Sequence, residues 1–208
     1  MDFLPDLSFT INPNEICRHL GFSSHTAVDP ATKRLIDECC ELLMKTVHPR
    51  GIYRTDRLLT DRSKEIPELI MAEGLVHIRG SRNLADNLDG CTGVTLVAAT
   101  LGPQADRLIA RAEKQSMAKA CVLQACAASM IESWLEAQNQ NLANRFEQEG
   151  FRLHPRFSPG YGDLPLNCQQ SVLNALDAGK YLGLQCLTGS DLMTPMKSIT
   201  ALIGHEPK

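Results

Sequence analysis

Several features that mark particular classes of protein are scarce or missing in this chain of 208 residues. Aromatic residues make up only 5% of it, and Lys plus Arg number 21 against 24 Asp plus Glu, which gives a formal net charge of −3. No run of one charge sign occurs along the chain. Because nucleic-acid binding needs a basic surface that neutralises phosphates, we expect no nucleic-acid partner.

Long apolar runs are also missing. The longest apolar stretches, such as 94–101, are far shorter than the roughly 20 residues of a membrane-spanning helix. We expect no signal peptide, because no charged, apolar and small-residue pattern of that kind is found at residue 1 and after. The eight cysteines include no C-x-x-C pair and lie mostly in apolar segments. We therefore expect no membrane association, a reducing cytoplasm as the location, and thiols that fill gaps in the core.

Motifs for metals and for nucleotide phosphates are missing too. The histidines have no metal-ligand spacing with one another, so no metal centre is expected. They are His19, His25, His48, His77, His154 and His205. The segment 101–104 (LGPQ) follows an apolar run but lacks the G-x-G-x-x-G spacing and the lysine of a phosphate-binding loop. We interpret it as a turn from a strand into a helix.

The chain does contain enough apolar material for a sizeable core. Hydrophobic residues account for 43% of a length that corresponds to one large domain or two small ones. Residues that commonly cap helices precede five predicted helices, of which the one that begins near residue 117 is the longest. The capping residues are Asn12, Asp29, Ser81, Ser116 and Asn167.

Apolar patterns predict strands between these helices. Residues 51–59, 75–78 and 197–204 fit strands, 3–11 fits an extended segment, and 66–73 fits a helix or a loop. A continuous apolar run rich in Val and Thr at 93–100 predicts a central strand that is buried on both faces. Helices and strands that alternate irregularly in this way indicate an α+β fold.

Glu132 is the polar residue whose position is most informative. At about 100° per residue, it falls within the stripe formed by Cys121, Ala125, Ala128 and Leu135 on the longest predicted helix. A carboxylate in such a stripe is partly buried, and burying an unpaired charge costs several kcal/mol. Glu132 should therefore meet a cation or hold a proton, either in a functional site or in an internal salt bridge or half-exposed helix edge.

The loop 156–162, with the sequence RFSPGYG, is a second candidate for a site. Its two glycines allow the backbone to approach a ligand closely, and its proline stiffens the turn. Arg156 can bind a carboxylate through two parallel hydrogen bonds, and Tyr161 offers an aromatic face with a hydroxyl group. The same composition also fits an ordinary surface turn with a solvated arginine.

Seven segments, taken together and in order, resemble those of a known family. They are Glu15–Phe22 (EICRHLGF), Pro49–Arg54 (PRGIYR), Leu84–Cys91 (LADNLDGC), Val97–Gly102 (VAATLG), Gln124–Glu132, Arg156–Tyr161 (RFSPGY) and Leu187–Thr200, which contains LTGS and MTPMKSIT. The family is the activation domain of cobalamin-dependent methionine synthase, and in particular its stand-alone bacterial relatives. The resemblance spans nearly the whole chain.

The resemblance carries expectations for fold and function. It implies a single domain over 1–208, in which 1–60 is an N-terminal helical part packed on the rest, and a central, mostly antiparallel, twisted sheet flanked by helices. In this family, cobalamin that has been oxidised to inactive cob(II)alamin is reduced by a flavodoxin-type donor and remethylated from S-adenosylmethionine, which the activation domain binds. The implied ligand is therefore S-adenosylmethionine, with cobalamin carried by a partner.

The implied partner is cobalamin-dependent methionine synthase or a related corrinoid protein. The chain would then be a component of methionine synthase activity rather than a stand-alone enzyme. The implied ligand-binding residues are Glu132, Arg156, Phe157, Ser158, Pro159, Gly160 and Tyr161. In this family, the arginine contacts the methionine end of the ligand, and the residues at 157–159 would contact the adenosine part through their backbone. The ligand has one carboxylate for an arginine and two positive centres for an acid.

The chain departs from the family at two places. The fused domain of methionine synthase carries a Trp-Tyr pair on its terminal strand, where this chain has Ala201-Leu202-Ile203. For an acidic ligand contact on the N-terminal side of the fused domain, Asp56 is the candidate here. Two alternatives therefore stay open. One is a non-catalytic subunit that docks on a corrinoid domain without binding the nucleoside. The other is an activator of another corrinoid methyltransferase, such as one that acts on methylamines or aryl methyl ethers.

Overall fold

The computed structural model describes residues 1–23 and 28–208. Its main sheet has five antiparallel strands in the order β1-β2-β6-β10-β7. These strands are β1 (Asp2–Phe3), β2 (Arg50–Arg57), β6 (Gly93–Thr100), β10 (Ser198–Pro207) and β7 (Phe151–Leu153). The predicted α+β fold with a mostly antiparallel central sheet is confirmed.

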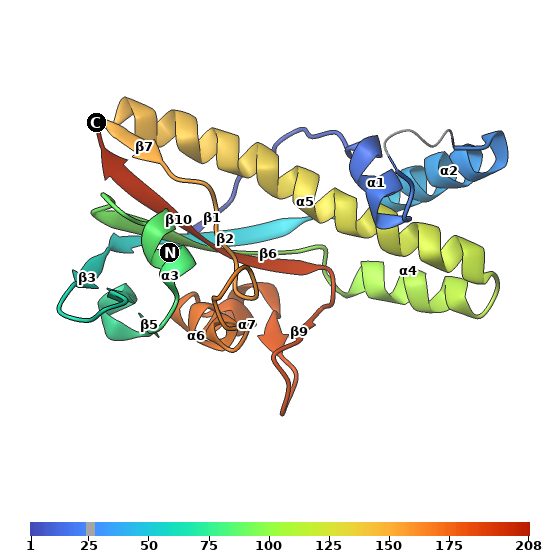
Figure 1. Cartoon of the computed structure of the whole chain (residues 1–208). Helices are drawn as coiled ribbons and strands as arrows, with labels where there is room; N and C mark the ends of the chain where they lie inside the picture. Colours follow the sequence, from blue (N-terminus) through green and yellow to red (C-terminus); the bar gives the residue numbers. More distant parts are fainter. Residues whose placement is uncertain (24–27) are drawn as a thin grey trace.

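Helices cover both faces of this sheet (Figure 1). The long helix α5 (Met117–Gln148) lies across one face, and α1 (Pro13–His19), α2 (Pro30–Thr46) and α4 (Pro103–Glu113) pack against α5. The opposite face carries α3 (Arg82–Asn87), α6 (Cys168–Ala175) and α7 (Ala178–Leu182). Two hydrophobic cores result, one on each side of the sheet.

Strand β6 lies at the centre of the sheet, between β2 and β10. Its side chains alternate between the two cores, because successive residues of a strand point to opposite faces. Val97 and Ala99 join the core beneath α5, whereas Leu96 and Ala98 join the core on the opposite face. The prediction of a central strand buried on both faces is confirmed.

Four of the five predicted helix caps are present. The side chains of Asn12, Asp29, Ser81 and Ser116 accept hydrogen bonds from backbone N–H groups in the first turns of α1, α2, α3 and α5. The prediction for Asn167 is wrong, because its side chain makes no capping hydrogen bond to α6. Asn167 has helical backbone angles (φ −63°, ψ −17°), whereas a capping residue usually has an extended backbone.

The expectation of a helix or a loop over 66–73 is wrong for residues 68–71, which form a strand. Strand β4 (Glu68–Met71) lies between β3 (Leu59–Asp61) and β5 (Val76–Ile78) in a second small sheet, and a short 3₁₀ helix (Ala72–Gly74) follows β4. Leu69 and Met71 alternate into the core, and this alternation stabilises the strand.

Other strand boundaries also differ from the expectation. The predicted strand 51–59 is divided into β2 and β3 at Leu58, whose side chain is buried. Of the predicted extended segment 3–11, only Phe3 lies in a strand, β1, which also contains Asp2 and pairs with β2. The hairpin of β8 (Gln185–Cys186) and β9 (Met193–Thr194) completes the described elements.

All eight cysteines, none of which falls in 24–27, are free thiols. Cys39 and Cys126 are fully buried between α2 and α5, as expected for small core residues. Cys121 contradicts that expectation, because it lies on the exposed side of α5. Within the described parts of the chain, no helix is both long and apolar enough to cross a membrane.

His205 on β10 is a buried histidine that remains neutral in the folded protein. Its side chain is 3% exposed, its Nε2 lies 2.7 Å from the hydroxyl of Thr95, and its ring centroid lies 4.1 Å from that of Phe146. Burial lowers the pKa of His205 to about 4, against an opposing effect of the nearby Glu149. The imidazole is therefore uncharged at neutral pH.

This burial predicts a stability that falls on acidification. Between the usual pKa of 6.5 and the folded value of about 4, the unfolded chain binds a proton at His205 and the folded chain does not. The free energy of unfolding should therefore fall by up to about 3 kcal/mol as the pH is lowered through this window. Urea denaturation at several pH values checks this, with His205→Gln as the control. Parallel pH profiles for the two proteins would contradict the prediction.

Candidate functional site

Helix α5 supplies one wall of the candidate site. Its polar residues Glu132, Ser133, Glu136 and Gln140 recur at helical spacing and so lie on one side of the helix. Trp134, which follows Ser133, is buried in the core. The helix therefore holds the carboxylates of Glu132 and Glu136 one turn apart on the same side.

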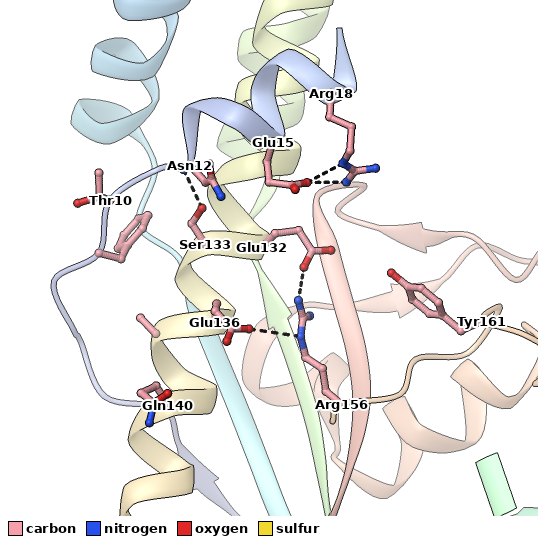
Figure 2. A pocket seen from close by; sticks show the side chains of 12 residues that line it. Thr10, Asn12, Glu15, Arg18, Glu132, Ser133, Glu136, Gln140, Arg156 and Tyr161 are labelled. Carbon is pink, nitrogen blue, oxygen red and sulfur yellow. Dashed lines mark hydrogen bonds and ion pairs between the residues drawn. The ribbon is translucent and has the colours of Figure 1, made fainter. Parts of the chain in front are cut away.

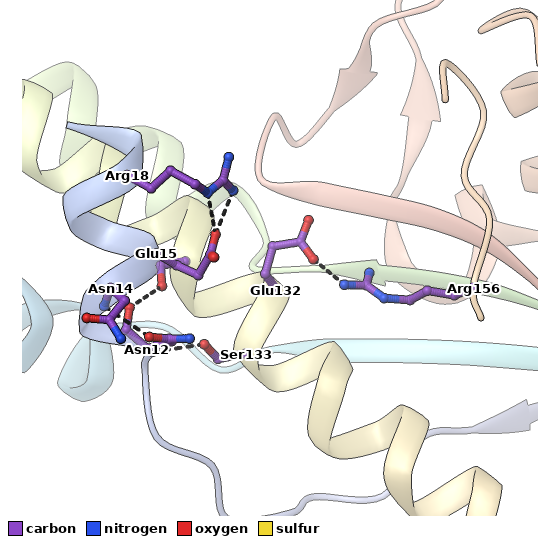
Figure 3. Close-up of polar contacts among 8 residues, drawn as sticks. Asn12, Asn14, Glu15, Arg18, Glu132, Ser133 and Arg156 are labelled. Carbon is purple, nitrogen blue, oxygen red and sulfur yellow. Dashed lines mark hydrogen bonds and ion pairs between the residues drawn. The ribbon is translucent and has the colours of Figure 1, made fainter. Parts of the chain in front are cut away.

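Arg156 belongs to the segment that follows β7 and continues alongside β10. The N–H of His154 donates to the carbonyl of Gly204 (2.9 Å), and Phe157 exchanges two backbone hydrogen bonds with Leu202 (2.8 Å each). These bonds at both sides of Arg156 fix its backbone, so that the guanidinium extends toward α5 (Figure 3).

The guanidinium of Arg156 and the carboxylate of Glu132 form an ion pair. Arg156 Nη2 donates to Glu132 Oε2 at 2.5 Å, and Arg156 Nε lies 4.0 Å from Glu136 Oε2. The side chains of Arg156 and Glu132 are 24% and 36% exposed, so both charges stay accessible from solvent. The expectation that Glu132 meets a cation is confirmed. The two candidates from the sequence, Glu132 and the loop 156–162, are therefore in contact.

The rest of the predicted loop turns away from α5 and then presents Tyr161. Pro159 is buried, and Gly160 has a φ of +90°, a conformation that favours glycine. The side chain of Tyr161 is 62% exposed, and its ring faces the space beside Arg156 and Glu132 (Figure 2). Both backbone groups of Phe157 are hydrogen-bonded to Leu202, and the carbonyl of Ser158 accepts a hydrogen bond from the N–H of Tyr161. Backbone contacts of residues 157–159 with adenosine stay a prediction.

Asp163 anchors this loop to α3. Its carboxylate accepts hydrogen bonds from the Ser81 hydroxyl (2.7 Å) and from the N–H groups of Arg82 (2.8 Å) and Asn83 (3.2 Å). The hydrogen bond from Ser81, followed by those from the backbone, holds the pKa of Asp163 below its usual value. The loop that carries Tyr161 is thus tied to an ordered helix at the end of its glycine-rich turn.

Helix α1 supplies a second wall, next to α5 (Figure 2). The N–H of Asn12 donates to Ser133 Oγ (3.0 Å), and Ser129 Oγ donates to the carbonyl of Asn12 (3.0 Å), so that the start of α1 is attached to α5. Arg18 donates to Glu15 Oε2 from both Nε (2.9 Å) and Nη2 (2.6 Å). This contact lowers the pKa of Glu15 and raises that of Arg18, so both groups are charged at neutral pH.

Helices α1 and α5 and the 156–161 loop line an open cleft of about 660 Å³. A volume of this size is typical of sites for small molecules and cofactors. Side chains from α1, α5 and the 156–161 loop converge on it (Figure 2). The lining residues are Phe9, Thr10, Asn12, Glu15, Arg18, Glu132, Ser133, Glu136, Ala137, Gln140, Arg156 and Tyr161. The cleft offers two guanidiniums, three carboxylates and an exposed aromatic ring to a ligand.

Sequence patterns alone do not identify several of the residues that line the cleft. Glu15 and Arg18 fall within the first of the segments that resemble the family, which was the available signal for them. Glu136 lies one turn after Glu132, and helical spacing alone could have identified it. For Asn12, the sequence pattern indicates only a helix cap.

Some candidates from the sequence lie away from the cleft. Asp56, suggested as the acidic contact on the N-terminal side, is bonded to Arg54 (2.6 and 2.9 Å) and lines a separate groove beside β3. Glu15 is instead the N-terminal acid that lines the cleft. His25 lies outside the described residues, among which no three His, Cys, Asp or Glu side chains gather as a metal site would require.

No protein-family model and no curated protein sequence matches the chain. Among solved structures, the chain is similar to the crystal structure of the MetH reactivation domain bound to AdoHcy, with a TM-score of 0.66 and 17% sequence identity. The similarity covers 92% of this chain and 72% of that chain. This protein therefore has the fold of that reactivation domain, and the relation expected from the resemblance is confirmed for the fold.

Proposed function

We propose that the protein binds S-adenosylmethionine (AdoMet) in this cleft and presents it to the cobalamin of a separate methyltransferase, methionine synthase, during reductive reactivation. The observation that carries the proposal is the Arg156–Glu132 pair in a ligand-sized cleft, because it provides the two charges that an amino-acid group requires. The similarity to a domain that binds AdoHcy adds support from the fold.

The amino-acid end of AdoMet fits this pair by charge. Its carboxylate would bind the guanidinium of Arg156 through two parallel hydrogen bonds, and its ammonium would bind the carboxylate of Glu132. The ligand thus replaces one internal ion pair with two ion pairs of its own. Neither protein charge is left buried without a partner, which would cost several kcal/mol.

The adenosine end would extend toward Tyr161. An exposed ring with a hydroxyl group can stack on a base and accept or donate a hydrogen bond at the same time. Because Asp163 anchors the loop to α3, the tyrosine is held near the cleft before the ligand arrives. Such fixed placement of the ligand is the contribution that a methyl transfer needs from this chain.

The other reactants belong to partners in this proposal. When bound, AdoMet supplies the methyl group, and the cobalamin of methionine synthase accepts it after a one-electron reduction by a flavodoxin-type donor. The protein would act in the reducing cytoplasm, where its eight thiols stay free. It is a component of methionine synthase activity and needs its partner for turnover.

Calorimetric titration with AdoMet tests the proposal. The purified protein should bind AdoMet saturably, and Glu132→Gln should weaken binding about tenfold or more, a loss of about 1.4 kcal/mol, because the ammonium loses its counterion. Addition to cob(II)alamin-loaded methionine synthase with a reductant and AdoMet should then yield methylcobalamin. If wild-type protein neither binds AdoMet nor supports this reaction, the proposal is wrong.

A second candidate function follows from the terminal strand. Ala201, Leu202 and Ile203 are buried in β10, where the family's fused domain carries a Trp-Tyr pair. This difference favours a subunit that docks on a corrinoid domain without binding the nucleoside. Complex formation with a corrinoid protein in the absence of any AdoMet binding would support this second candidate. If methyl transfer occurs to the corrinoid of another methyltransferase and not to that of methionine synthase, the partner is that other methyltransferase.

A further inference from the structure

The charges that line the cleft do not balance. Among the described residues, three carboxylates line it, those of Glu15, Glu132 and Glu136, against the two guanidiniums of Arg18 and Arg156. The pKa of Glu15 is lowered and that of Arg18 is raised by their mutual hydrogen bonds. The walls of the cleft therefore carry a net charge of −1 at neutral pH.

The pairing within the cleft identifies the surplus carboxylate. Glu15 is paired with Arg18 at 2.6 Å, and Glu132 is paired with Arg156 at 2.5 Å. Glu136 Oε2 is 4.0 Å from Arg156 Nε, and the side chain of Glu136 is 65% exposed. Because each guanidinium already has a nearer carboxylate, the charge of Glu136 is the least compensated in the cleft.

We infer that Glu136 is a specificity-determining residue that makes the cleft prefer the cationic sulfonium of AdoMet to the neutral thioether of S-adenosylhomocysteine (AdoHcy). This inference rests on the proposed function. The two ligands share their carboxylate, ammonium and adenosine groups. They differ by one methyl group and by the positive charge that it places on sulfur.

The position of Glu136 suits this role. Once the ligand's carboxylate and ammonium bind Arg156 and Glu132, the remaining charge of AdoMet is its sulfonium. The short aliphatic chain of the methionine group joins this sulfonium to the carbon that carries the ammonium. Glu136 lies one helical turn beyond Glu132 on the same side of α5, about 5–6 Å away between Cβ atoms. Its carboxylate is thus in reach of the sulfonium while Glu132 holds the ammonium.

This arrangement has a consequence for turnover. Loss of the methyl group removes the ligand's net positive charge, and the net charge of −1 in the cleft is then no longer neutralised. The spent ligand is held less tightly than the fresh one. Exchange of AdoHcy for AdoMet is therefore favoured by the charge of the cleft itself, without a change of conformation.

Titration calorimetry with AdoMet and with AdoHcy tests the inference on the full chain. Wild-type protein should bind AdoMet about fivefold more tightly, the factor that about 1 kcal/mol of attraction between unit charges gives. Glu136→Gln should bring the two affinities close together, mainly by weakening AdoMet. Glu132→Gln should weaken both ligands by a similar factor, because both carry the ammonium.

Glu147→Gln is a matched control. Glu147 also lies on α5 but is paired with Lys208, away from the cleft, so the same change of charge there should leave the ratio of affinities unchanged. Two results would overturn the inference and leave the proposed function intact. One is equal affinity of the wild-type protein for AdoMet and AdoHcy. The other is a preference for AdoMet that remains in Glu136→Gln. Failure of the wild-type protein to bind either ligand would overturn both.

Discussion

Arg156→Ala is expected to reduce the affinity for AdoMet by about 30-fold or more, since truncating one partner of a partly buried charge pair costs about 2–5 kcal/mol. The variant loses the group that would hold the ligand's carboxylate, and it leaves that carboxylate near Glu132 and Glu136. Attraction is then replaced by repulsion at the same place. Calorimetry with AdoMet measures the loss.

Arg156→Lys separates charge from geometry in this experiment. Lysine keeps the positive charge but lacks the planar fork that binds both oxygens of a carboxylate, so an intermediate loss of about tenfold is expected. The thermal stability of Arg156→Lys should stay close to that of the wild type, because lysine keeps a positive charge beside Glu132 and the backbone of 154–157 is held by β10. An unchanged affinity in Arg156→Ala would remove Arg156 from the site.

Trp134→Ala is expected to lower the free energy of unfolding by about 3–5 kcal/mol. The indole is 2% exposed and lies in the core between α5 and the sheet. It packs directly over Gly51, where an added Cβ would lie 3.0 Å from Trp134 Cη2 and 2.6 Å from Leu4 Cδ1. Alanine would leave a cavity at the point where α5 rests on β2.

Urea denaturation measures this effect, and Trp134→Phe serves as the control because a smaller ring fills part of the cavity. The phenylalanine variant should lose clearly less stability than the alanine variant. Trp134 is also next to Ser133, whose hydroxyl holds the start of α1, so Trp134→Ala should weaken AdoMet binding even under conditions where it stays folded. A loss of stability below about 1 kcal/mol would show that the core closes over the missing ring.

Some elements of this fold are determined by neighbouring residues, and others by contacts between distant parts of the chain. The starts of α1, α2, α3 and α5 were predictable, because a cap residue bonds to an N–H group only two or three residues away. Strand β4 was missed because only Leu69 and Met71 show its alternation, which is too short a pattern to distinguish a strand from a loop. Its pairing with β3 and β5 is decided by the fold.

The candidate site also depends on both local patterns and tertiary contacts. Helical periodicity alone predicts that Glu132 needs a partner, but Arg156 is brought to it by the pairing of 154–157 with β10, which no local pattern encodes. Glu15 and Arg18 reach the cleft because Asn12 is bonded to two serines of α5. Their pairing at i and i+3 looks in the sequence like an ordinary surface ion pair of a helix.

The attachment of α1 through Asn12 has an evolutionary consequence. The wall of the cleft that α1 supplies is a seven-residue helix outside every sheet, joined to the rest by Ile16 in the core and by the bonds of Asn12 to Ser129 and Ser133. Mutations at Glu15 and Arg18 can therefore accumulate without disturbing the packing of the sheet. Descendants of one ancestral chain can diverge in the ligand or partner they accept by changes in this short segment, while Glu132 on α5 and Arg156 on the 156–162 loop stay the same.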